Sequence, residues 1–262
     1  MKNKYNKYTN IFDSHAHYDM ERFKSDKNKL IAEFKEKGIV AITNIGADMQ
    51  SSRNSIKLAN EHDYFYATVG VHPHSAKEMV DKDFIELEKL TKNKKCVAIG
   101  EIGLDYHYDY SPRDVQKQRF RDQMKLAQKL KMPVVIHSRE ATEDVITILK
   151  EFSDVKCVIH SFSGSVETAR IMLKMGHYLG FTGVVTFQNA RVPKEVAAMV
   201  PLDRFLIETD APFLAPTPFR GKRCDSSMVY RVAEQIAEIR GMNPQEIINR
   251  ATKNTKTFYQ IP

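Results

Sequence analysis

The chain has 262 residues, of which 42% are hydrophobic and 28% are charged, which is typical of a globular protein that folds in water. No apolar run approaches the ~18 residues that a membrane-spanning helix needs, and no apolar segment follows the basic residues 1–7, so neither a membrane protein nor a secretory signal is predicted. We therefore expect a cytoplasmic protein. The net charge of +7 is compatible with a polyanionic substrate, although lysine-rich proteins without nucleic-acid partners are also basic.

The cysteines are few and widely spaced, and no pair forms a C-x-x-C motif. Cys96, Cys157 and Cys224 therefore predict neither a disulfide framework nor a structural zinc site. Cys96 and Cys157 each begin an apolar run, so we expect them in the core.

Short β-rich runs alternate with longer amphipathic stretches along the chain, a pattern that indicates parallel βα units. Strands are expected up to His17 and at 39–45, 66–71, 96–99, 134–136, 157–159, 178–182 and 205–207. Helices are expected at 21–37, 51–62, around 83–90, from an N-cap at Ser111 to just before Pro133, around 145–149, at 165–176, around 228–241 and after a cap at Asn243.

Eight such strands with helices between them predict a single-domain (β/α)8 TIM barrel over residues 1–262. A doubly wound open sheet is the alternative. The barrel implies that functional side chains lie at the carboxyl ends of its strands.

Potential metal ligands occur at just these places. His15 and His17 are two positions apart on the first strand, so both rings can point to the same side. The other four, each at or just after a later strand end, are Glu101, His137, His160 and Asp210. Any one of these residues can be explained as a structural or turn residue. If all of them were, five different strand ends would each carry a metal-ligand type by chance.

Four imidazoles and two carboxylates suffice to hold two divalent ions. Magnesium, manganese and zinc are all compatible with these ligands. Glu101 is the natural bridge, with His15, His17 and Asp210 on one ion and His137 and His160 on the other. Such a pair can activate a water for phosphodiester hydrolysis, and Asp210 can accept its proton. Glu101 and Asp210 are thus the predicted catalytic residues.

Several motifs together closely resemble the TatD family of metal-dependent deoxyribonucleases, from about residue 11 to residue 255. They are 13–17 (DSHAH), 70–74 (GVHPH), 100–106 (GEIGLDY), 137–139 (HSR), 160–164 (HSFSG) and 208–212 (ETDAP). The resemblance implies a TIM barrel of the metallo-dependent hydrolase type, divalent metal and DNA hydrolysis, often from a 3′ end, with the same six metal residues. One departure is that Arg220-Gly221-Lys222-Arg223 continues into Cys224-Asp225-Ser226 instead of the family's usual Asn-Glu-Pro.

Substrate contacts are assigned to side chains near the predicted mouth. Arg220, Lys222 and Arg223 can hold phosphates, although a solvated basic loop explains them as well. His72 and His74 can contact a phosphate or the leaving group, or simply shape the mouth. Arg139 can bind a phosphate or orient a carboxylate. The tyrosines of residues 106–110 offer rings for an unpaired base, or cover the barrel mouth.

We therefore predict a metal-dependent nuclease for DNA, a 3′–5′ exodeoxyribonuclease that prefers single-stranded ends, with no obligate protein partner and no membrane partner. The alternative keeps the metal site but cleaves an amide, ester or lactone, for example in an aminoacyl-tRNA deacylase. A third reading, a barrel that binds without catalysis, would require a missing ligand, and none is missing.

Overall fold

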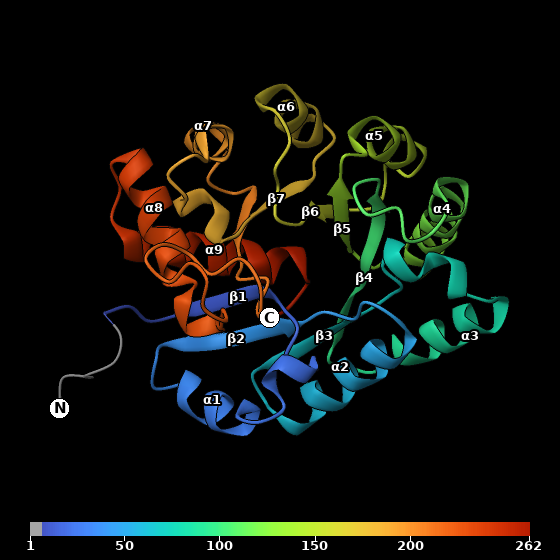
Figure 1. The fold of residues 1–262 in the computed structure, drawn as a ribbon, viewed down its shortest axis with the longest axis horizontal. Helices are drawn as coiled ribbons and strands as arrows, with labels where there is room; N and C mark the ends of the chain where they lie inside the picture. Colours follow the sequence, from blue (N-terminus) through green and yellow to red (C-terminus); the bar gives the residue numbers. More distant parts are fainter. Residues whose placement is uncertain (1–6) are drawn as a thin grey trace.

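The computed structural model describes residues 7–262, which form a TIM barrel of eight parallel strands surrounded by helices, as the sequence predicts (Figure 1). The basic segment at residues 1–6 lies outside the described part of the chain. The strands follow one another around the sheet in sequence order. They are β1 (Ile11–Ala16), β2 (Ile39–Asn44), β3 (Phe65–Val69), β4 (Cys96–Asp105), β5 (Val134–Arg139), β6 (Cys157–Ile159), β7 (Tyr178–Phe181) and β8 (Phe205–Ile207).

The helices connect successive strands and cover the outside of the sheet (Figure 1). The α-helices are α1 (Lys27–Phe34), α2 (Met49–Glu61), α3 (Asp81–Leu90), α4 (Arg113–Leu130), α5 (Thr142–Glu151), α6 (Val166–Lys174), α7 (Arg191–Met199), α8 (Tyr230–Arg240) and α9 (Pro244–Phe258). Short 3-10 helices are η1 (Glu21–Phe23), η2 (Pro73–Glu78), η3 (Gly183–Thr186) and η4 (Ser226–Met228).

Three of these helices differ from the sequence prediction. The helix expected at 21–37 is broken into η1 and α1. The structure also contains α7, for which no helix was predicted. Helix α4 begins after Pro112 rather than at a Ser111 cap, because the Ser111 hydroxyl donates to the carbonyl of His74 instead of capping the helix.

Backbone and side-chain bonds close the barrel between the first and last strands. Ala16 forms a parallel bridge with Ala211, and the amide of Asp210 donates to the carbonyl of His15 over 2.9 Å. The buried carboxylate of Asp13 accepts from both the amide (2.9 Å) and the hydroxyl (2.6 Å) of Thr209. The segments that carry the first and the last predicted metal ligands are therefore held side by side.

Side chains alternate between the inside and the outside of the barrel. On β5, Val134 and Ile136 pack with the core that includes the helices, whereas Val135 packs with the separate cluster inside the barrel. Val158 of β6 and Leu206 of β8 belong to the same inner cluster. Because strand side chains repeat every two residues, positions 137, 160 and 208 continue these inner rows upward into the barrel mouth.

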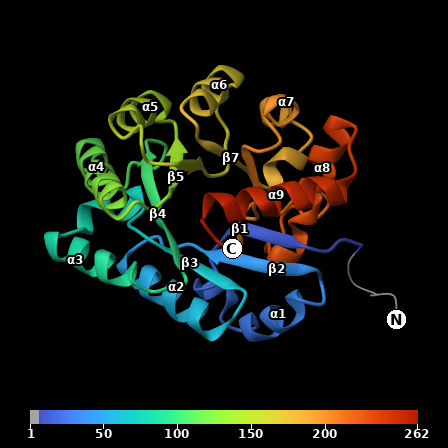
Figure 2. The same cartoon turned by 180° about the vertical axis from the view of Figure 1, so that it is seen from behind.

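The opposite end of the barrel is covered by α9 and the carboxyl terminus (Figure 2). Phe258 and Tyr259 pack into the inner cluster, where each is only 3% exposed. The Tyr259 hydroxyl donates to the carbonyl of Ser14, over 2.9 Å. Helix α9 thus closes the bottom of the barrel and leaves the carboxyl ends of the strands as its open end.

Strand β4 is longer than predicted, so Glu101 lies within the strand rather than after it. The register with β5 shifts between Ile99 and Ile102, which is an irregularity of the kind that redirects a side chain next to an active site. Gly103 then passes so close to β5 that an added Cβ would lie 2.0 Å from the carbonyl oxygen of His137. Only glycine fits there without displacing the strand that carries His137.

Among the described helices, none combines the length and the apolar character required to cross a lipid bilayer. Cys96 and Cys157 are buried, as the sequence predicts, and Cys224 is buried as well; all three are free cysteines.

Candidate metal centre

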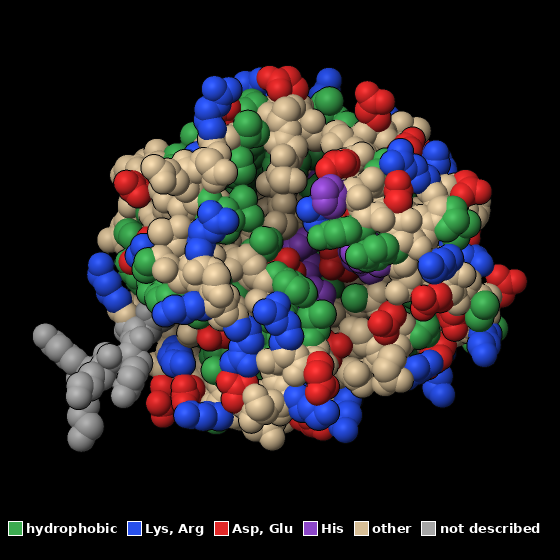
Figure 3. Space-filling model, in the orientation of Figure 1, with side chains coloured by type: hydrophobic (Ala, Val, Ile, Leu, Met, Phe, Trp, Pro, Cys, Tyr) green, Lys and Arg blue, Asp and Glu red, His purple; other side chains and the backbone are tan. Residues whose placement is uncertain are grey.

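A cavity of about 900 Å³ opens at the carboxyl ends of the strands. Histidine and acidic side chains gather at its floor, with hydrophobic side chains beside them (Figure 3). Its walls include eight residues that the sequence analysis selected, namely His17, His72, His74, Glu101, His137, Arg139, His160 and Asp210. His15 is 1% exposed and faces the same cluster from below.

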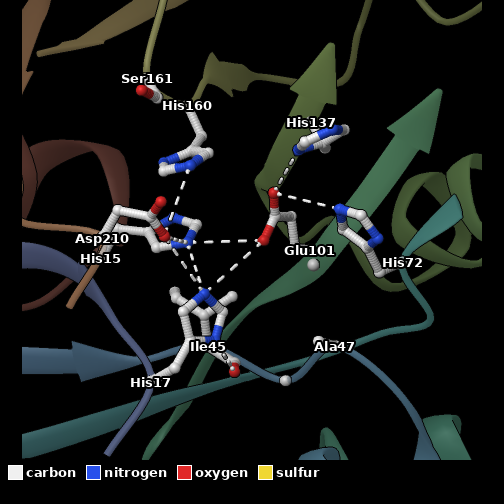
Figure 4. A network of polar contacts seen from close by, with 12 residues as sticks. His15, His17, Ile45, Ala47, His72, Glu101, His137, His160, Ser161 and Asp210 are labelled. Atoms are coloured by element: carbon white, nitrogen blue, oxygen red, sulfur yellow. Dashed lines mark hydrogen bonds and ion pairs between the residues drawn. The ribbon is translucent and has the colours of Figure 1, made fainter. Parts of the chain in front are cut away.

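The six predicted metal ligands point toward one another (Figure 4). Within residues 7–262, three groups each have potential ligand atoms within 4.8 Å of one another. They are His15–His17–Asp210, His15–Glu101–His160 and His72–Glu101–His137. In this structure His160 thus groups with His15, and none of the three groups contains both His137 and His160.

The spacing of these atoms fits a shared cation better than direct hydrogen bonds. Nε2 of His15 lies 3.1 Å from Nε2 of His17, 3.5 Å from Oε2 of Glu101 and 3.6 Å from Oδ1 of Asp210. Donors bound to one ion at about 2.1 Å stand roughly 3.0–3.5 Å apart in octahedral or tetrahedral geometry. The donor set therefore fits a divalent metal.

Glu101 faces the two halves of the site with its two oxygens (Figure 4). Oε2 lies 3.5 Å from Nε2 of His15 and 3.9 Å from that of His17. Oε1 lies 2.9 Å from Nδ1 of His137. One carboxylate is therefore in position to contact two ions.

Hydrogen-bond acceptors behind the histidines decide which ring nitrogen can bind a metal. Nδ1 of His17 lies 3.1 Å from the carbonyl oxygen of Ile45, which can only accept, so Nε2 is left with its lone pair facing the site. Nδ1 of His160 lies 2.8 Å from Glu208, and Nε2 of His137 lies 3.0 Å from Asp105. Asp105 therefore keeps the ring proton of His137 on Nε2, and the charge of Glu208 favours a proton on Nδ1 of His160, so the other nitrogen of each ring faces the centre.

His72 has the opposite arrangement. Its Nδ1 accepts from the backbone amide of His74 over 3.2 Å, so in the neutral ring the proton is on Nε2. That Nε2 points toward Oε1 of Glu101, at 3.7 Å. His72 is thus better suited to donate a hydrogen bond to an oxygen than to bind a cation.

The electrostatics of the cluster favour added positive charge. Burial opposes ionisation of Glu101, but nearby His160 and His72 and the hydrogen bond from His137 hold its pKa well below the ordinary value. Burial opposes protonation of His160, but Glu208, Glu101 and Asp210 outweigh it and raise the pKa of His160 to about 10. A metal would compete with protons for these nitrogens.

Asp105 and Glu208 are site residues to which the sequence analysis gave no role. Both are almost fully buried, and both lie within motifs that it quoted. Glu208 also accepts from the amide of Ser161 over 2.6 Å, and Gly180 leaves room for it, because a Cβ at that position would lie 2.5 Å from its Oε1. Asp105 is two positions after Gly103, and Glu208 is two positions before Asp210, and such spacing indicates only which residues can share a face. That Asp105 pairs with His137 and Glu208 with His160 could be recognised only from the tertiary structure.

The basic loop lies away from the cluster. Arg220, Lys222 and Arg223 are not among the described residues that line the cavity. The Arg220 guanidinium lies 4.1 Å from the centre of the Phe187 ring, and Arg223 binds both carboxylate oxygens of Asp26. Lys222 of the same loop is exposed to solvent.

The segment after Arg223, which departs from the family's usual sequence, is anchored beneath the first strand. Cys224 is buried, and the Ser226 hydroxyl donates to Asp13 over 2.6 Å. The Ser226 amide donates to the Tyr18 hydroxyl over 2.7 Å. The altered sequence therefore contributes to the support of the strand that carries His15 and His17.

The family described as TatD related DNase matches residues 12–260 of this chain. The chain belongs to that family. A Bacillus subtilis relative named uncharacterized metal-dependent hydrolase YabD is 46% identical over 253 residues, covering 96% of this chain and 99% of its own. The protein of Erwinia tasmaniensis named 3'-5' ssDNA/RNA exonuclease TatD is 31% identical, covering 96% of this TatD-related chain and all of its own.

A solved structure confirms the fold of this TatD-family chain. The TatD homologue YJJV from Escherichia coli superimposes with a TM-score of 0.91 at 28% sequence identity. The match covers 97% of this chain and 99% of the other. The barrel predicted from the strand pattern is therefore the barrel of the family.

Proposed function

We propose that this protein is a divalent-metal-dependent phosphodiesterase that hydrolyses DNA, a 3′–5′ exodeoxyribonuclease acting on single-stranded ends. The observation that carries the proposal is the position of Glu101, whose two oxygens face separate histidine groups (Figure 4). A pair of sites joined by one carboxylate suits the displacement at a phosphodiester. The nuclease name of the Erwinia tasmaniensis relative supports the substrate class.

The proposed ligands are His15, His17 and Asp210 for one ion and His137 and His160 for the other, with Glu101 between them. Magnesium, manganese and zinc all suit this donor set. When bound there, such ions would activate a water and offset the charge on the attacking and leaving oxygens. In this proposal Asp105 and Glu208 hold the ring protons of His137 and His160 away from the ions.

The remaining side chains bind the substrate and move protons. Asp210, whose side chain is 16% exposed, reaches the cavity and accepts the proton of the attacking water. The Nε2–H of His72 donates to a phosphate oxygen at the Glu101 side of the site. His74 and Arg139 line the same wall and can hold a neighbouring phosphate, whereas Lys222 supplies longer-range attraction.

The direct test incubates the purified protein with a labelled single-stranded oligonucleotide, with magnesium or manganese and with a chelator. We expect products that shorten stepwise from the 3′ end only when metal is present. A 3′-blocked strand and a blunt duplex, run in parallel, report end preference and strand preference. The absence of any metal-dependent product would contradict the proposal.

The same preparation tests the alternative, a metal-dependent hydrolase of amides or esters. Simple esters, lactones and a misacylated tRNA are supplied under the same metal conditions. Turnover of one of these without cleavage of any nucleic acid would assign the site to that class.

A further inference from the structure

Two tyrosines beside the cavity are exposed to solvent although neighbouring side chains contact both rings. Tyr108 is 46% exposed and Tyr110 is 56% exposed. Their ring centres are 5.3 Å apart and their planes differ by 22°, so the rings are stacked on each other. Tyr108 lines the cavity that contains the metal ligands. A pair of exposed, stacked aromatic rings is a surface on which another flat ring can be placed.

Neighbouring side chains hold the pair in position. The ring of His74 meets Tyr108 and Tyr110 edge-on, with centres 5.4 and 4.8 Å apart. The guanidinium of Arg139 lies over the Tyr108 ring at 4.8 Å. Asp109, between the tyrosines, has a left-handed backbone (φ 51°) and is paired with Arg113 at 2.7 Å. These contacts support this loop conformation in the absence of a ligand.

The pair is linked to the candidate metal centre through one carboxylate. Asp105 accepts from the backbone amide of Tyr108 over 2.9 Å and lies 3.0 Å from Nε2 of His74. The same Asp105 lies 3.0 Å from Nε2 of His137, whose other nitrogen faces Glu101. The loop that carries the tyrosines is thus connected to the candidate metal centre through Asp105 and His137.

Simple packing does not account for these two rings. Tyr106, in the same loop, is half-buried, its hydroxyl is bonded to Asp144, and its ring is covered by the guanidinium of Arg113. Tyr108 is covered on its ring by Arg139, whereas Tyr110 is the more exposed member of the stack. The row Arg139–Tyr108–Tyr110 therefore ends on a ring open to solvent.

We propose that Tyr108 and Tyr110 form a nucleobase-stacking subsite that holds one unpaired base next to the phosphodiester to be cleaved. This inference rests on the proposed nuclease function and adds the physical origin of its strand preference. In a duplex both faces of a base are stacked and its edge is paired, so only an unpaired or terminal base can occupy the platform. Stacking tolerates any base, and purines, which have the larger rings, bind more tightly than pyrimidines.

The test measures binding rather than cleavage. A short single-stranded oligonucleotide with hydrolysis-resistant phosphorothioate linkages and a fluorescent 5′ label is titrated with the metal-loaded protein, and its anisotropy gives Kd. Tyr110→Ala is expected to raise Kd about 5- to 150-fold, which is the range for loss of one base–aromatic stack. Tyr110→Phe, which keeps the ring, is the matched control and should bind within about twofold of the wild type.

A series of oligonucleotides carrying one abasic position connects the loss to a base. For the wild type, an abasic residue at a single position near the 3′ end should weaken binding as much as Tyr110→Ala does. The same abasic residue should cost Tyr110→Ala little, because the two changes remove the same contact. This double-mutant cycle also identifies which base is bound.

The possible outcomes distinguish failure of the proposed subsite from failure of the proposed nuclease function. If the wild type cleaves single strands with metal, but Tyr110→Ala binds as tightly as the wild type or the abasic losses are equal in both proteins, the subsite is wrong and the nuclease stands. If the wild type neither cleaves nor binds any oligonucleotide, the proposed function and the subsite are both wrong.

Discussion

Glu101 connects the two parts of the candidate metal centre through a single side chain. One of its oxygens faces His15 and His17, and the other faces His137. The carboxylate is 3% exposed, so any change in its charge acts where solvent screens little. The effect of a substitution here should therefore fall on metal binding and turnover rather than on the fold.

We expect Glu101→Gln to lower kcat/KM at least ~1,000-fold on a single-stranded oligonucleotide, because a neutral amide would hold a divalent cation far less well than the carboxylate does. Asp210→Asn should act in the same direction through loss of a ligand and of the proton acceptor. Steady-state kinetics with saturating manganese measures both, and circular dichroism checks that the fold is kept. Near-normal turnover in either variant would show that the assigned roles are wrong.

Asp105 contacts the proposed metal ligand His137 and would affect metal binding through it. Asp105→Asn keeps the size of the side chain but removes the charge that orients His137 and His74. We expect metal affinity to fall by about 10- to 100-fold, the usual effect of losing such a partner. Competition against a chelating dye measures the affinity. Asp109→Asn, an exposed carboxylate on the same loop, is the control and should bind metal like the wild type.

At the scale of the elements, parallel strands bring distant ligands together because all eight carboxyl ends open on one side. The inner rows that contain Val135 and Val158 carry His137 and His160 directly above them. The other end must be closed to keep this core dry, and α9 closes it with Phe258 and Tyr259.

Phe258→Ala should therefore destabilise the whole barrel although it lies at the end opposite the site. Removing a buried phenylalanine costs about 3–5 kcal/mol through lost burial and the cavity that remains. Urea unfolding at pH 7 measures the free energy of unfolding. Thr257→Ala, an exposed neighbour on α9, should change it by less than about 0.5 kcal/mol. Equal stability of the two variants would contradict this role for α9.

For the molecule as a whole, the dependence of stability on pH includes a contribution far from the metal ligands. His177, just before β7, is fully buried, and neither of its ring nitrogens has a hydrogen-bond partner among the described residues. Burial, with a smaller effect from Lys156, lowers its pKa from 6.5 to about 4. The folded protein therefore keeps this ring neutral at a pH at which the unfolded chain already binds a proton.

The sign of the effect follows from that difference. Between pH 6.5 and 4 the unfolded state gains a proton that the folded state does not, so folding stability falls as the pH falls, by roughly 3 kcal/mol in total. His177→Leu should remove this part of the acid sensitivity. Urea unfolding at pH 7 and pH 4.5 compares it with the wild type and with His107→Ala, an exposed control. A variant with the same loss on acidification as the wild type would contradict the assignment.

Much of the architecture could be predicted because it depends on local periodicity. Alternating strands and helices predict the barrel, and a polar ligand type directly after an apolar run predicts the open end, as with His137 after Val134–Ile136. Helix α7 was missed because Arg191–Met199 is short and is stabilised by packing against neighbouring helices.

By itself, the sequence determined the fold class and the six potential ligands, because both depend on residue type and on spacing within one strand. Only the tertiary structure decided which ring nitrogen of His137 and of His160 faces the centre, since the carboxylates that set it, Asp105 and Glu208, come from other parts of the chain. It likewise showed that Arg223 is already bound to Asp26, 197 positions away, a pairing that no local pattern encodes.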